Sequence, residues 1–470
     1  MTQLQGSLVN ALQREFAGRV ETDPASLHCY AFDASHYSRR NPNTPLAVVF
    51  PSSTGDVQTL VRLCGQHEVR IVPRGAGTGQ TGGAVPIDAN SIVLDMSTLN
   101  QPISVDLANL QVTVQAGIVA EALNDLVASD GFFFPPDPGS IKMCTIGGMI
   151  ANNASGMRAV KYGTTRNYVL GLEVVLADGS VITTGGARSR VLKTVSGYDL
   201  TALFVGSEGT LGIITAARIK VAPLPEARGL VLAAFSDLES AGRGVQAIFR
   251  GGMIPSALEL MDRLAINTVI NYRPDLNLPK EAEALLIIEV DGLSVGVSEG
   301  IEKIKNLLEP TADDITYSSD PDECQQLWEA RRAIGPASGT LRPNARRVSA
   351  GEDIGVPMGR VPEALSRVHA VLTDTGVTAP VYGHVGDGNF HVALVADGND
   401  EEQILAAERA ADQLHLLALD MEGTTTGEHG VGLSRAPYMS QEHDLALETM
   451  RKIKHSLDPK GLLNAGKMGL

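Results

Sequence analysis

The sequence has few cysteines, a deficit of positive charge and no long apolar run, and each shortage excludes a class of protein. The 470 residues include four cysteines, Cys29, Cys64, Cys144 and Cys324, which lie far apart in the chain. This spacing argues against a cysteine-bound iron–sulfur cluster or structural zinc site and favours reduced thiols in a cytoplasmic protein. No apolar run reaches the roughly 18 residues that a membrane span requires.

The start of the chain and its net charge both argue against export and against binding to an anionic membrane. MTQLQGSLVNALQREFAGRV has no basic segment followed by a continuous apolar stretch, so we predict an amphipathic helix and no signal peptide. Lys and Arg number 38 against 54 Asp and Glu, a formal net charge of −16. This acidity disfavours nucleic acid and anionic membranes as partners, and an anionic substrate would need a local basic residue.

Length and patterning predict an α+β protein of two or three domains. Hydrophobic residues make up 43% of the chain and glycines number 49, which suits a large core with many close backbone approaches. The composition shifts at PLPEARG (223–229), where we place a boundary. Before it we expect two βα-rich lobes, and after it an antiparallel sheet with helices on one face.

The expected elements follow from apolar periodicity and turn residues. A hairpin is expected over 167–186, with its turn at Asp178–Gly179. We found no internal repeat and no low-complexity segment. The expected helices span 54–67, 119–129, 238–249, 295–308, 322–334 and 361–373, and the expected strands span 91–96, 110–117, 229–237, 283–292, 346–356 and 391–396.

A glycine-dense loop, PRGAGTGQTGGAVP (73–86), is the first functional signal. Gly77, Gly79 and Gly82 have the Rossmann spacing, but that fold needs a helix to begin at the loop, and Gly83, Val85 and Pro86 begin one poorly. We therefore predict no NAD site. Successive backbone N–H groups in such a loop can still hold a pyrophosphate, with Arg74 and Thr78 as added donors.

Two further glycine-rich stretches lie in the same half of the chain. They read PPDPGSIKMCTIGGMIANNASGMRAVKYG (135–163) and VGSEGTLGIIT (205–215). Each is weak evidence alone. Three such segments together predict one large ligand that is contacted at several points.

In this order the three motifs resemble the FAD-binding domain of the vanillyl-alcohol-oxidase-type (PCMH-fold) flavoproteins. Within them the chain is similar to the branch of D-lactate dehydrogenase, the glycolate oxidase flavoprotein subunit and D-2-hydroxyglutarate dehydrogenase, over essentially its whole length. The resemblance implies an N-terminal helical segment (1–43), a two-lobed FAD-binding domain (44–223) and an α+β substrate or cap domain (224–420). A C-terminal segment (421–470) then returns to complete the FAD domain and the active site.

The resemblance also implies the residues that bind FAD. We see no obvious His or Cys for covalent attachment, so we predict non-covalent FAD. The implied residues are Arg74, Gly75, Ala76, Gly77, Thr78, Gly79, Thr81 and Gly82 at the pyrophosphate, Pro138, Gly139, Ser140, Thr145, Gly148, Asn152, Ser155 and Gly156 along the flavin and ribityl chain, Glu208, Gly209 and Ile214 at the adenine side or the isoalloxazine, and Asn464 near the C-terminus.

A histidine–carboxylate set is the second functional signal. His384 and His391 flank a tight Gly-Asp-Gly-Asn turn, and Glu428 and His429 lie between glycines in GTTTGEHGVG. Two His and one Glu suit a catalytic metal site with open positions, and neighbours on an extended segment point to opposite sides, so Glu428 and His429 can divide metal binding and substrate contact between them. The resemblance implies His384, His391 and Glu428 as ligands of zinc or manganese, and His429 as the catalytic base.

This set suits oxidation of a D-2-hydroxy acid to the 2-oxo acid. The metal would lower the pKa of the substrate hydroxyl, His429 would take its proton, and the Cα hydrogen would pass as hydride to flavin N5. The resemblance implies Arg331, in LWEARRAIG, as the partner of the substrate carboxylate.

Two departures bear on the substrate. Relatives that act on D-2-hydroxyglutarate carry a lysine just before the Asp of the next strand, where this chain has Gly351 and Glu352 ahead of Asp353. They also carry an Asn two residues past the second histidine, where this chain has Ala393. We therefore favour D-lactate or glycolate over D-2-hydroxyglutarate or D-malate, although nearby arginines offer replacement cations (Arg342, Arg346 and Arg347).

The remaining expectations concern partners. The electron acceptor is left open among a quinone, a cytochrome, an electron-transferring flavoprotein and a partner subunit. The protein is expected in the cytoplasm, peripheral at a membrane if its acceptor lies there, and a homodimer stays open. Two rival readings are a metal-free aryl-alcohol-type oxidase of the same fold and a non-catalytic electron-transfer subunit that holds FAD; the His/His/Glu set argues against both.

Overall fold

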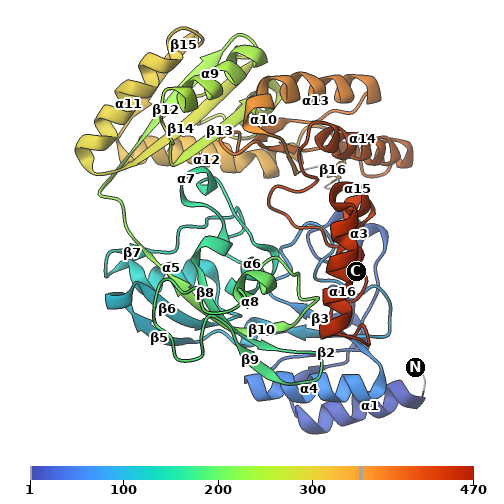
Figure 1. Ribbon diagram of the computed structural model, residues 1–470. Coiled ribbons are helices and arrows are strands. Elements are labelled where there is room, and N and C mark those ends of the chain that lie inside the picture. Colours follow the sequence, from blue (N-terminus) through green and yellow to red (C-terminus); the bar gives the residue numbers. More distant parts are fainter. Residues whose placement is uncertain (1–2, 349–352) are drawn as a thin grey trace. The chain divides into compact units, whose positions relative to one another are not determined.

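A computed structural model describes residues 3–348 and 353–470 (Figure 1). The chain divides into two compact units. The first gathers Met1–Ser155, Thr164–Leu224 and Glu428–Leu470, and the second gathers Gly156–Gly163 and Pro225–Gly427. Each unit thus combines segments that are distant in sequence, whereas the domains expected above were continuous; those expected bounds stay a prediction.

The first lobe of unit one is a four-stranded sheet in the order β1-β2-β4-β3. β2 and β3 run parallel to β4, and β1 is antiparallel to β2. The periodic apolar side chains of α4 pack on one face together with Leu8, Leu12 and Phe16 from the N-terminal helix region. The elements are α1 (Gln3–Glu15), β1 (Val20–Glu21), α2 (Pro24–Cys29), α3 (His36–Arg40), β2 (Ala47–Val49), α4 (Thr54–His67), β3 (Arg70–Arg74) and β4 (Ser91–Asp95).

The second lobe is a five-stranded antiparallel sheet in the order β5-β6-β10-β8-β9. The expected hairpin is confirmed as β8 and β9, and Gly179 in its turn has φ +78°. The elements are β5 (Pro102–Asp106), β6 (Gln111–Gln115), α5 (Ala120–Ala128), β7 (Phe132–Phe133), α6 (Ile146–Asn152), β8 (Val169–Val175), β9 (Val181–Thr183), α8 (Leu200–Phe204), β10 (Ile213–Lys220) and β11 (Ala222–Pro223), which pairs with β7.

The C-terminal segment returns to the first unit, as predicted. It contains α15 (Met439–His443) and α16 (Leu445–Leu457). After α16 the Asp458 carboxylate accepts the backbone N–H groups of Leu462 and Leu463, and both leucines join the core beneath α4. Burying two leucines contributes roughly 3 to 6 kcal/mol, which holds the segment against the first lobe.

The second unit is built on a seven-stranded sheet in the order β15-β12-β14-β13-β18-β19-β17. All its neighbouring strands pair antiparallel, as predicted for this half of the chain. The strands are β12 (Ala227–Phe235), β13 (Ala257–Asp262), β14 (Ala284–Gly292), β15 (Asp314–Ser318), β17 (Ile354–Gly355), β18 (Val381–Gly383) and β19 (Asn389–Val392).

Helices cover both faces of this sheet, so the expectation of one covered face is wrong (Figure 1). Alternate residues of β12 enter two different cores: Val231 and Ala233 lie in one, and Leu230 and Ala234 lie in the other. The first core includes α9 (Leu238–Arg250), α11 (Ser294–Leu308), α13 (Val361–Thr375) and α14 (Glu401–Asp420); the second includes α10 (Arg263–Tyr272) and α12 (Pro321–Ser338).

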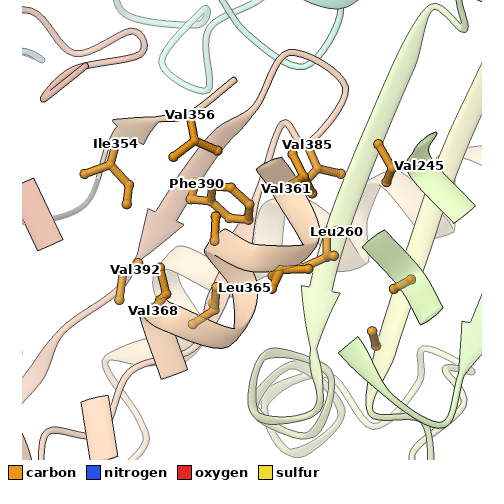
Figure 2. Packing of buried hydrophobic residues seen from close by; sticks show 14 of the residues in the cluster. Val245, Leu260, Ile354, Val356, Val361, Leu365, Val368, Val385, Phe390 and Val392 are labelled. Atoms are coloured by element: carbon orange, nitrogen blue, oxygen red, sulfur yellow. The ribbon is translucent and has the colours of Figure 1, made fainter. Parts of the chain in front are cut away.

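The first of these cores supports the strands that carry the predicted metal ligands (Figure 2). Phe390 and Val392 of β19 pack with Leu365 and Val368 of α13, and all four side chains are fully buried. Because successive strand residues point to opposite faces, this packing directs His391 to the other face of the sheet.

Two expected strands are wrong as single strands. The segment expected as 346–356 contains β16 (Ala345–Arg347) and β17, and that expected as 391–396 contains parts of β19 and β20 (Val395–Asp397). β16 pairs with β20 in a separate two-stranded sheet, whereas β17 pairs with β19. Apolar runs alone cannot show where a chain changes sheets. Gly351 and Glu352 lie outside the described residues.

A short segment from the first half of the chain is built into the second unit. α7 (Ala159–Tyr162) lies there with Arg158, which makes two bonds to the Glu289 carboxylate, at 2.7 Å and 2.9 Å, and lies over the ring of Trp328. The side chains of Lys161 and Tyr162 bind Asp291 on the same strand, β14. Charge therefore fixes this segment, and apolar periodicity did not reveal it.

Candidate active site

The three glycine-rich segments come together in the first unit. A Cβ added to Gly209 would lie 2.8 Å from Cγ of Pro73, one on Gly75 would lie 2.3 Å from Oγ1 of Thr145, and one on Gly83 would lie 3.5 Å from the Glu208 carboxylate. These approaches require glycine, because a side chain would collide at the first two positions. The structure thus groups the three segments that the sequence assigned to one ligand.

The loop between β3 and β4 has the features of a backbone phosphate cradle. No helix begins in residues 75–90, all of which are described. Open space lies above Gly79 and Gly139, where a ligand can reach the backbone. Thr145 caps α6 by accepting the N–H of Gly148 at 3.2 Å. This donor-rich surface fits a pyrophosphate.

Arg74 is held beside this loop. Its guanidinium lies 5.3 Å from the ring of Tyr30 and donates to the carbonyl of Ala84 at 3.2 Å. Burial lowers the pKa of Arg74, while the carboxylates of Asp33 and Asp95 oppose that shift. A half-buried cation beside a glycine loop suits an anionic ligand.

The Glu208 side chain joins the C-terminal segment to the third glycine segment. Its carboxylate accepts the N–H groups of Val431 at 2.6 Å and Gly432 at 2.8 Å, and burial raises its pKa. Asn464 donates to the carbonyls of Glu208 and Gly83, at 2.6 Å and 2.9 Å, and its Oδ1 is buried without a hydrogen-bond partner among the described residues. These contacts fix the chain that follows Glu428 and His429.

His429 lies in the first unit among predicted FAD-binding residues. Its Nε2 is 3.0 Å from the amide nitrogen of Gln80, and its carbonyl accepts from Asn152 at 3.1 Å. The same Nε2 lies 3.7 Å from Oε1 of Glu428, so it faces both an amide and a carboxylate. With that nitrogen unprotonated, the imidazole could act as a general base. Ser155 donates to the neighbouring Glu428 carboxylate at 3.3 Å.

The second unit gathers its polar groups on one face of the seven-stranded sheet. Across β13, β18 and β19 the strand register pairs Met261 with Tyr382, and Tyr382 with His391. Alternation then puts Glu259, Tyr382 and His391 on the same face, opposite to the core of Figure 2. His384 follows β18 directly and meets His391 ring to ring, with centroids 4.9 Å apart.

One buried carboxylate links the two histidines to the predicted substrate arginine. Glu259 is fully buried; its Oε1 is 2.7 Å from Nδ1 of His384, and its Oε2 accepts from Nε of Arg331 at 2.7 Å. Burial opposes its ionisation, but the charges of His384 and Arg331 and the hydrogen bond from His384 outweigh that effect and lower the pKa of Glu259.

Arg331 has an N–H donor that makes no hydrogen bond to the described residues. It projects from α12, is 6% exposed, and lies 4.7 Å from the centroid of the Tyr382 ring. Its Nη2 is buried and has no hydrogen-bond partner within the described part of the chain. An unsatisfied guanidinium nitrogen costs roughly 1 to 3 kcal/mol or more when buried, so this atom fits a site for an anionic ligand.

The predicted metal ligands also come together. His384, His391 and Glu428 each offer a ligand atom, and the three atoms lie within 4.8 Å of one another. Glu428 directly follows Gly427, the last residue of the second unit. Two imidazoles and a carboxylate suit a divalent transition metal with open positions for substrate.

The remaining predicted residues are placed as follows. The predicted FAD-binding residues lie in the first unit, apart from Gly156, which belongs to the second. Ala393 is fully buried among apolar side chains, and Arg342 donates to Gln403. Arg347 donates to the hydroxyl of Tyr382 at 3.3 Å, next to Arg331.

Sequence reasoning missed Glu259, Tyr382 and Gln80. One signal was available for Glu259, because ALELM places a carboxylate inside an apolar run, and a buried charge needs partners. β13 was not expected at all, so its pairing with β18 was out of reach. Gln80 stood in the quoted glycine loop without a distinguishing feature.

Two family models match the chain, and together they cover most of it. Residues 45–185 match the "FAD binding domain", and residues 224–468 match "FAD linked oxidases, C-terminal domain". The chain therefore belongs to the FAD-linked oxidase family, and its first unit contains the FAD-binding domain.

Within this family, the chain is similar to curated proteins named for 2-hydroxy acids. Glycolate oxidase subunit GlcD of Bacillus subtilis is 37% identical over 441 residues, which cover 93% of this chain and 91% of that protein. A probable mitochondrial D-lactate dehydrogenase of Danio rerio is 36% identical, covering 90% and 84%. D-2-hydroxyglutarate dehydrogenase of Xanthomonas citri pv. viticola is 32% identical, covering 96% and 94%.

Solved structures support the fold. 4-Ethylphenol oxidase from Gulosibacter chungangensis superposes with a TM-score of 0.82 at 17% identity, covering all of this chain and 97% of that one. p-Cresol methylhydroxylase gives a TM-score of 0.82 at 16% identity, covering 100% and 98%. The predicted PCMH-type α+β fold is confirmed. Among the described residues, no helix has both the length and the apolar character needed to cross a bilayer.

Proposed function

We propose that this protein carries out FAD-dependent, metal-assisted oxidation of a small D-2-hydroxy acid to the 2-oxo acid, with D-lactate as the preferred substrate. The observation that carries the proposal is the Nη2 of Arg331, which is buried without a hydrogen-bond partner among the described residues, in the unit that also presents His384 and His391. Such a nitrogen suits a substrate carboxylate, and the imidazoles suit a metal that the adjoining hydroxyl can reach.

The relatives support the class of substrate. The printed names of the three curated relatives refer to glycolate, D-lactate and D-2-hydroxyglutarate, all of which are 2-hydroxy acids. The preference for the D-enantiomer rests on these relatives, because side-chain spacing does not fix handedness.

Each of the chain's residues has a defined task. Arg331 binds the carboxylate, with its guanidinium oriented by Glu259 and by the Tyr382 ring. His384, His391 and Glu428 hold the metal, for which zinc or manganese is the proposed identity. His429 takes the hydroxyl proton at Nε2, for which the amide nitrogen of Gln80, 3.0 Å away, must give up its position to the substrate hydroxyl.

The two bound groups supply what side chains cannot. The metal, when bound, supplies a Lewis acid that lowers the pKa of the substrate hydroxyl. FAD, when bound non-covalently, supplies the acceptor for the hydride that leaves Cα. A second acceptor, such as a quinone, a cytochrome or an electron-transferring flavoprotein, then returns the enzyme to its oxidised state.

The surroundings of the site favour a monocarboxylate. Ala393 offers no hydrogen-bonding side chain at the position two residues past His391. Arg347, one of the arginines that could replace the missing lysine, donates to the hydroxyl of Tyr382, which occupies part of its hydrogen-bonding capacity. A dicarboxylate such as D-2-hydroxyglutarate or D-malate is therefore expected to react more slowly than D-lactate.

The test is anaerobic reduction of the bound flavin, followed by bleaching of its absorbance, with a panel of acids. The panel holds both enantiomers of lactate, glycolate, D-malate and D-2-hydroxyglutarate. We expect D-lactate to bleach the flavin fastest and L-lactate slowly. Equal rates with both lactates would reject the proposed stereochemistry, a faster reaction with D-2-hydroxyglutarate would replace the substrate, and no bleaching by any acid would reject the function.

A further inference from the structure

Glu259 stands between the two groups to which the proposed function gives separate tasks. One of its oxygens lies 2.7 Å from Nδ1 of the proposed metal ligand His384, and the other accepts a hydrogen bond from Nε of Arg331, also at 2.7 Å. The carboxylate is fully buried and belongs to neither group's own element, since it comes from β13.

The bond to His384 fixes which ring nitrogen can bind a metal. A carboxylate only accepts, so Nδ1 of His384 carries the hydrogen, and in the neutral ring that a metal would bind, Nε2 keeps its lone pair. A carboxylate on the second nitrogen of a metal-bound imidazole also fixes the ring plane and raises its basicity as a ligand.

The bond to Arg331 fixes the direction of its remaining donors. With Nε on Glu259 and the guanidinium plane near the Tyr382 ring, Nη2 stays buried and without a partner among the described residues. The same carboxylate thus orients the imidazole that would hold the metal and the guanidinium that would hold the substrate.

We propose that Glu259 is the positioning residue that couples the metal site to the carboxylate site, by accepting from His384 and Arg331 at the same time. The inference rests on the proposed function, because it assigns a task to Glu259 within that site. It extends the function from separate binding groups to one hydrogen-bonded unit, in which loss of either bond disturbs a defined partner.

Glu259→Gln tests this with little change in shape. A glutamine amide offers one acceptor oxygen to two donors, so its NH₂ group must face one of them. Facing His384, it would shift the ring hydrogen to Nε2 and weaken metal binding; facing Arg331, it would displace the guanidinium. Two measurements on the FAD-loaded protein separate these cases: the dissociation constant of Zn²⁺ in competition with a chromophoric chelator, and the D-lactate concentration that half-saturates anaerobic flavin reduction.

We expect at least one of these two quantities to rise by roughly 10- to 100-fold, the usual effect of removing a partner of a metal ligand. Values of both within twofold of the wild type would overturn the proposal. If Glu259→Gln does not accumulate with FAD, Glu259→Asp takes its place, because the shorter side chain keeps the charge but cannot reach both donors; the same criterion applies.

Glu289→Gln is the matched control. Glu289 is also a buried carboxylate of the same sheet that pairs with an arginine, but its partners are Arg158 and the indole N–H of Trp328. The control should shift the emission of Trp328, the chain's one tryptophan, and leave the Zn²⁺ constant unchanged. Glu259→Gln should do the reverse. An equal loss of Zn²⁺ affinity in both variants would mean that Glu259 has a general structural role.

The wild type distinguishes failure of this inference from failure of the proposed function. If wild-type protein binds no Zn²⁺ that His384→Ala removes, or if D-lactate does not reduce its flavin, the proposed function fails. If it passes both tests and Glu259→Gln also behaves as wild type, the coupling role alone fails.

Discussion

At the scale of single residues, His429 is the proposed base. The amide nitrogen of Gln80 lies 3.0 Å from its Nε2 and orients the imidazole, and Asn152 donates to its backbone carbonyl. We expect His429→Asn to lower the rate of flavin reduction by D-lactate by about 10²- to 10⁴-fold, the usual contribution of a positioned base. The substrate concentration for half-saturation should change much less, because Arg331 and the metal ligands remain.

The metal content of the variant provides the control for His429. Near-normal reduction by His429→Asn would place the base elsewhere. Loss of metal from the variant would show that His429 is a ligand, and the tasks of Glu428 and His429 would have to be reassigned.

Asp262 adds a pH dependence of stability. It ends β13, caps α10 by accepting the N–H of Ala265 at 2.7 Å, and is 2% exposed. Burial raises its pKa to about 7; Glu283 adds to this shift, and His369, 3.6 Å away, has a pKa that burial lowers. The folded state therefore holds a proton that the unfolded state releases near its lower pKa, so this contribution is fully present in acid and is lost as pH rises through 7.

Asp262→Asn removes the titration and keeps the cap. We expect its free energy of unfolding to exceed that of the wild type at pH 8 by roughly 2 to 4 kcal/mol, with the difference shrinking toward pH 4. The measurement is a series of thermal unfolding curves across this range. A difference that does not vary with pH would contradict the assignment.

At the scale of elements, the contact between β18 and β19 determines where the two histidines lie. A Cβ added to Gly383 would stand 2.3 Å from the carbonyl oxygen of Asn389 and 2.9 Å from Cα of Phe390. Gly383→Ala should separate the strands, lower the free energy of unfolding by roughly 1 to 3 kcal/mol and weaken Zn²⁺ binding. Thermal unfolding and chelator competition measure the two effects.

Gly296→Ala is the control for this substitution. Gly296 lies in α11 with no neighbour within 4 Å of an added Cβ, so alanine should be neutral or should stabilise the helix by several tenths of a kcal/mol. Wild-type Zn²⁺ affinity in Gly383→Ala would show that the strand pairing does not set the positions of His384 and His391.

The sequence was informative about elements where one signal was strong. Val57, Leu60, Val61 and Cys64 predicted α4, and Asp178–Gly179 predicted the hairpin turn. It failed where strand pairing decides the outcome. β13 was not predicted, and 346–356, which includes residues of both β16 and β17, was predicted as one strand, because strand order and sheet changes depend on contacts between distant residues.

For the site, residue type and glycine flanks were enough to select His384, His391 and Glu428, which the structure gathers. The partners of these residues could not be selected in this way. Glu259 and His384 are 125 positions apart, and their hydrogen bond depends on the order β13-β18. Supporting residues are set by topology, which a single sequence does not reveal.

At the scale of the whole molecule, the predicted FAD-binding residues and two of the three predicted metal ligands lie in different segments. The predicted FAD-binding residues other than Gly156 lie in the first unit, whereas His384 and His391 lie in the second and Glu428 begins the last segment of the first. The purified protein should therefore be yellow, should release intact FAD on denaturation, and should keep FAD when the metal is removed. A colourless protein that cannot be reconstituted with FAD would contradict the membership of this branch.

The central claim is that a metal held by His384, His391 and Glu428 takes part in oxidation of the hydroxy acid by the bound flavin. The most direct measurement is anaerobic flavin reduction by D-lactate before chelation, after chelation with metal content verified, and after metal is restored. We expect the chelated protein to keep its FAD spectrum and lose reduction, and to recover the rate with zinc or manganese. Reduction at the full rate by verified metal-free protein would contradict the account.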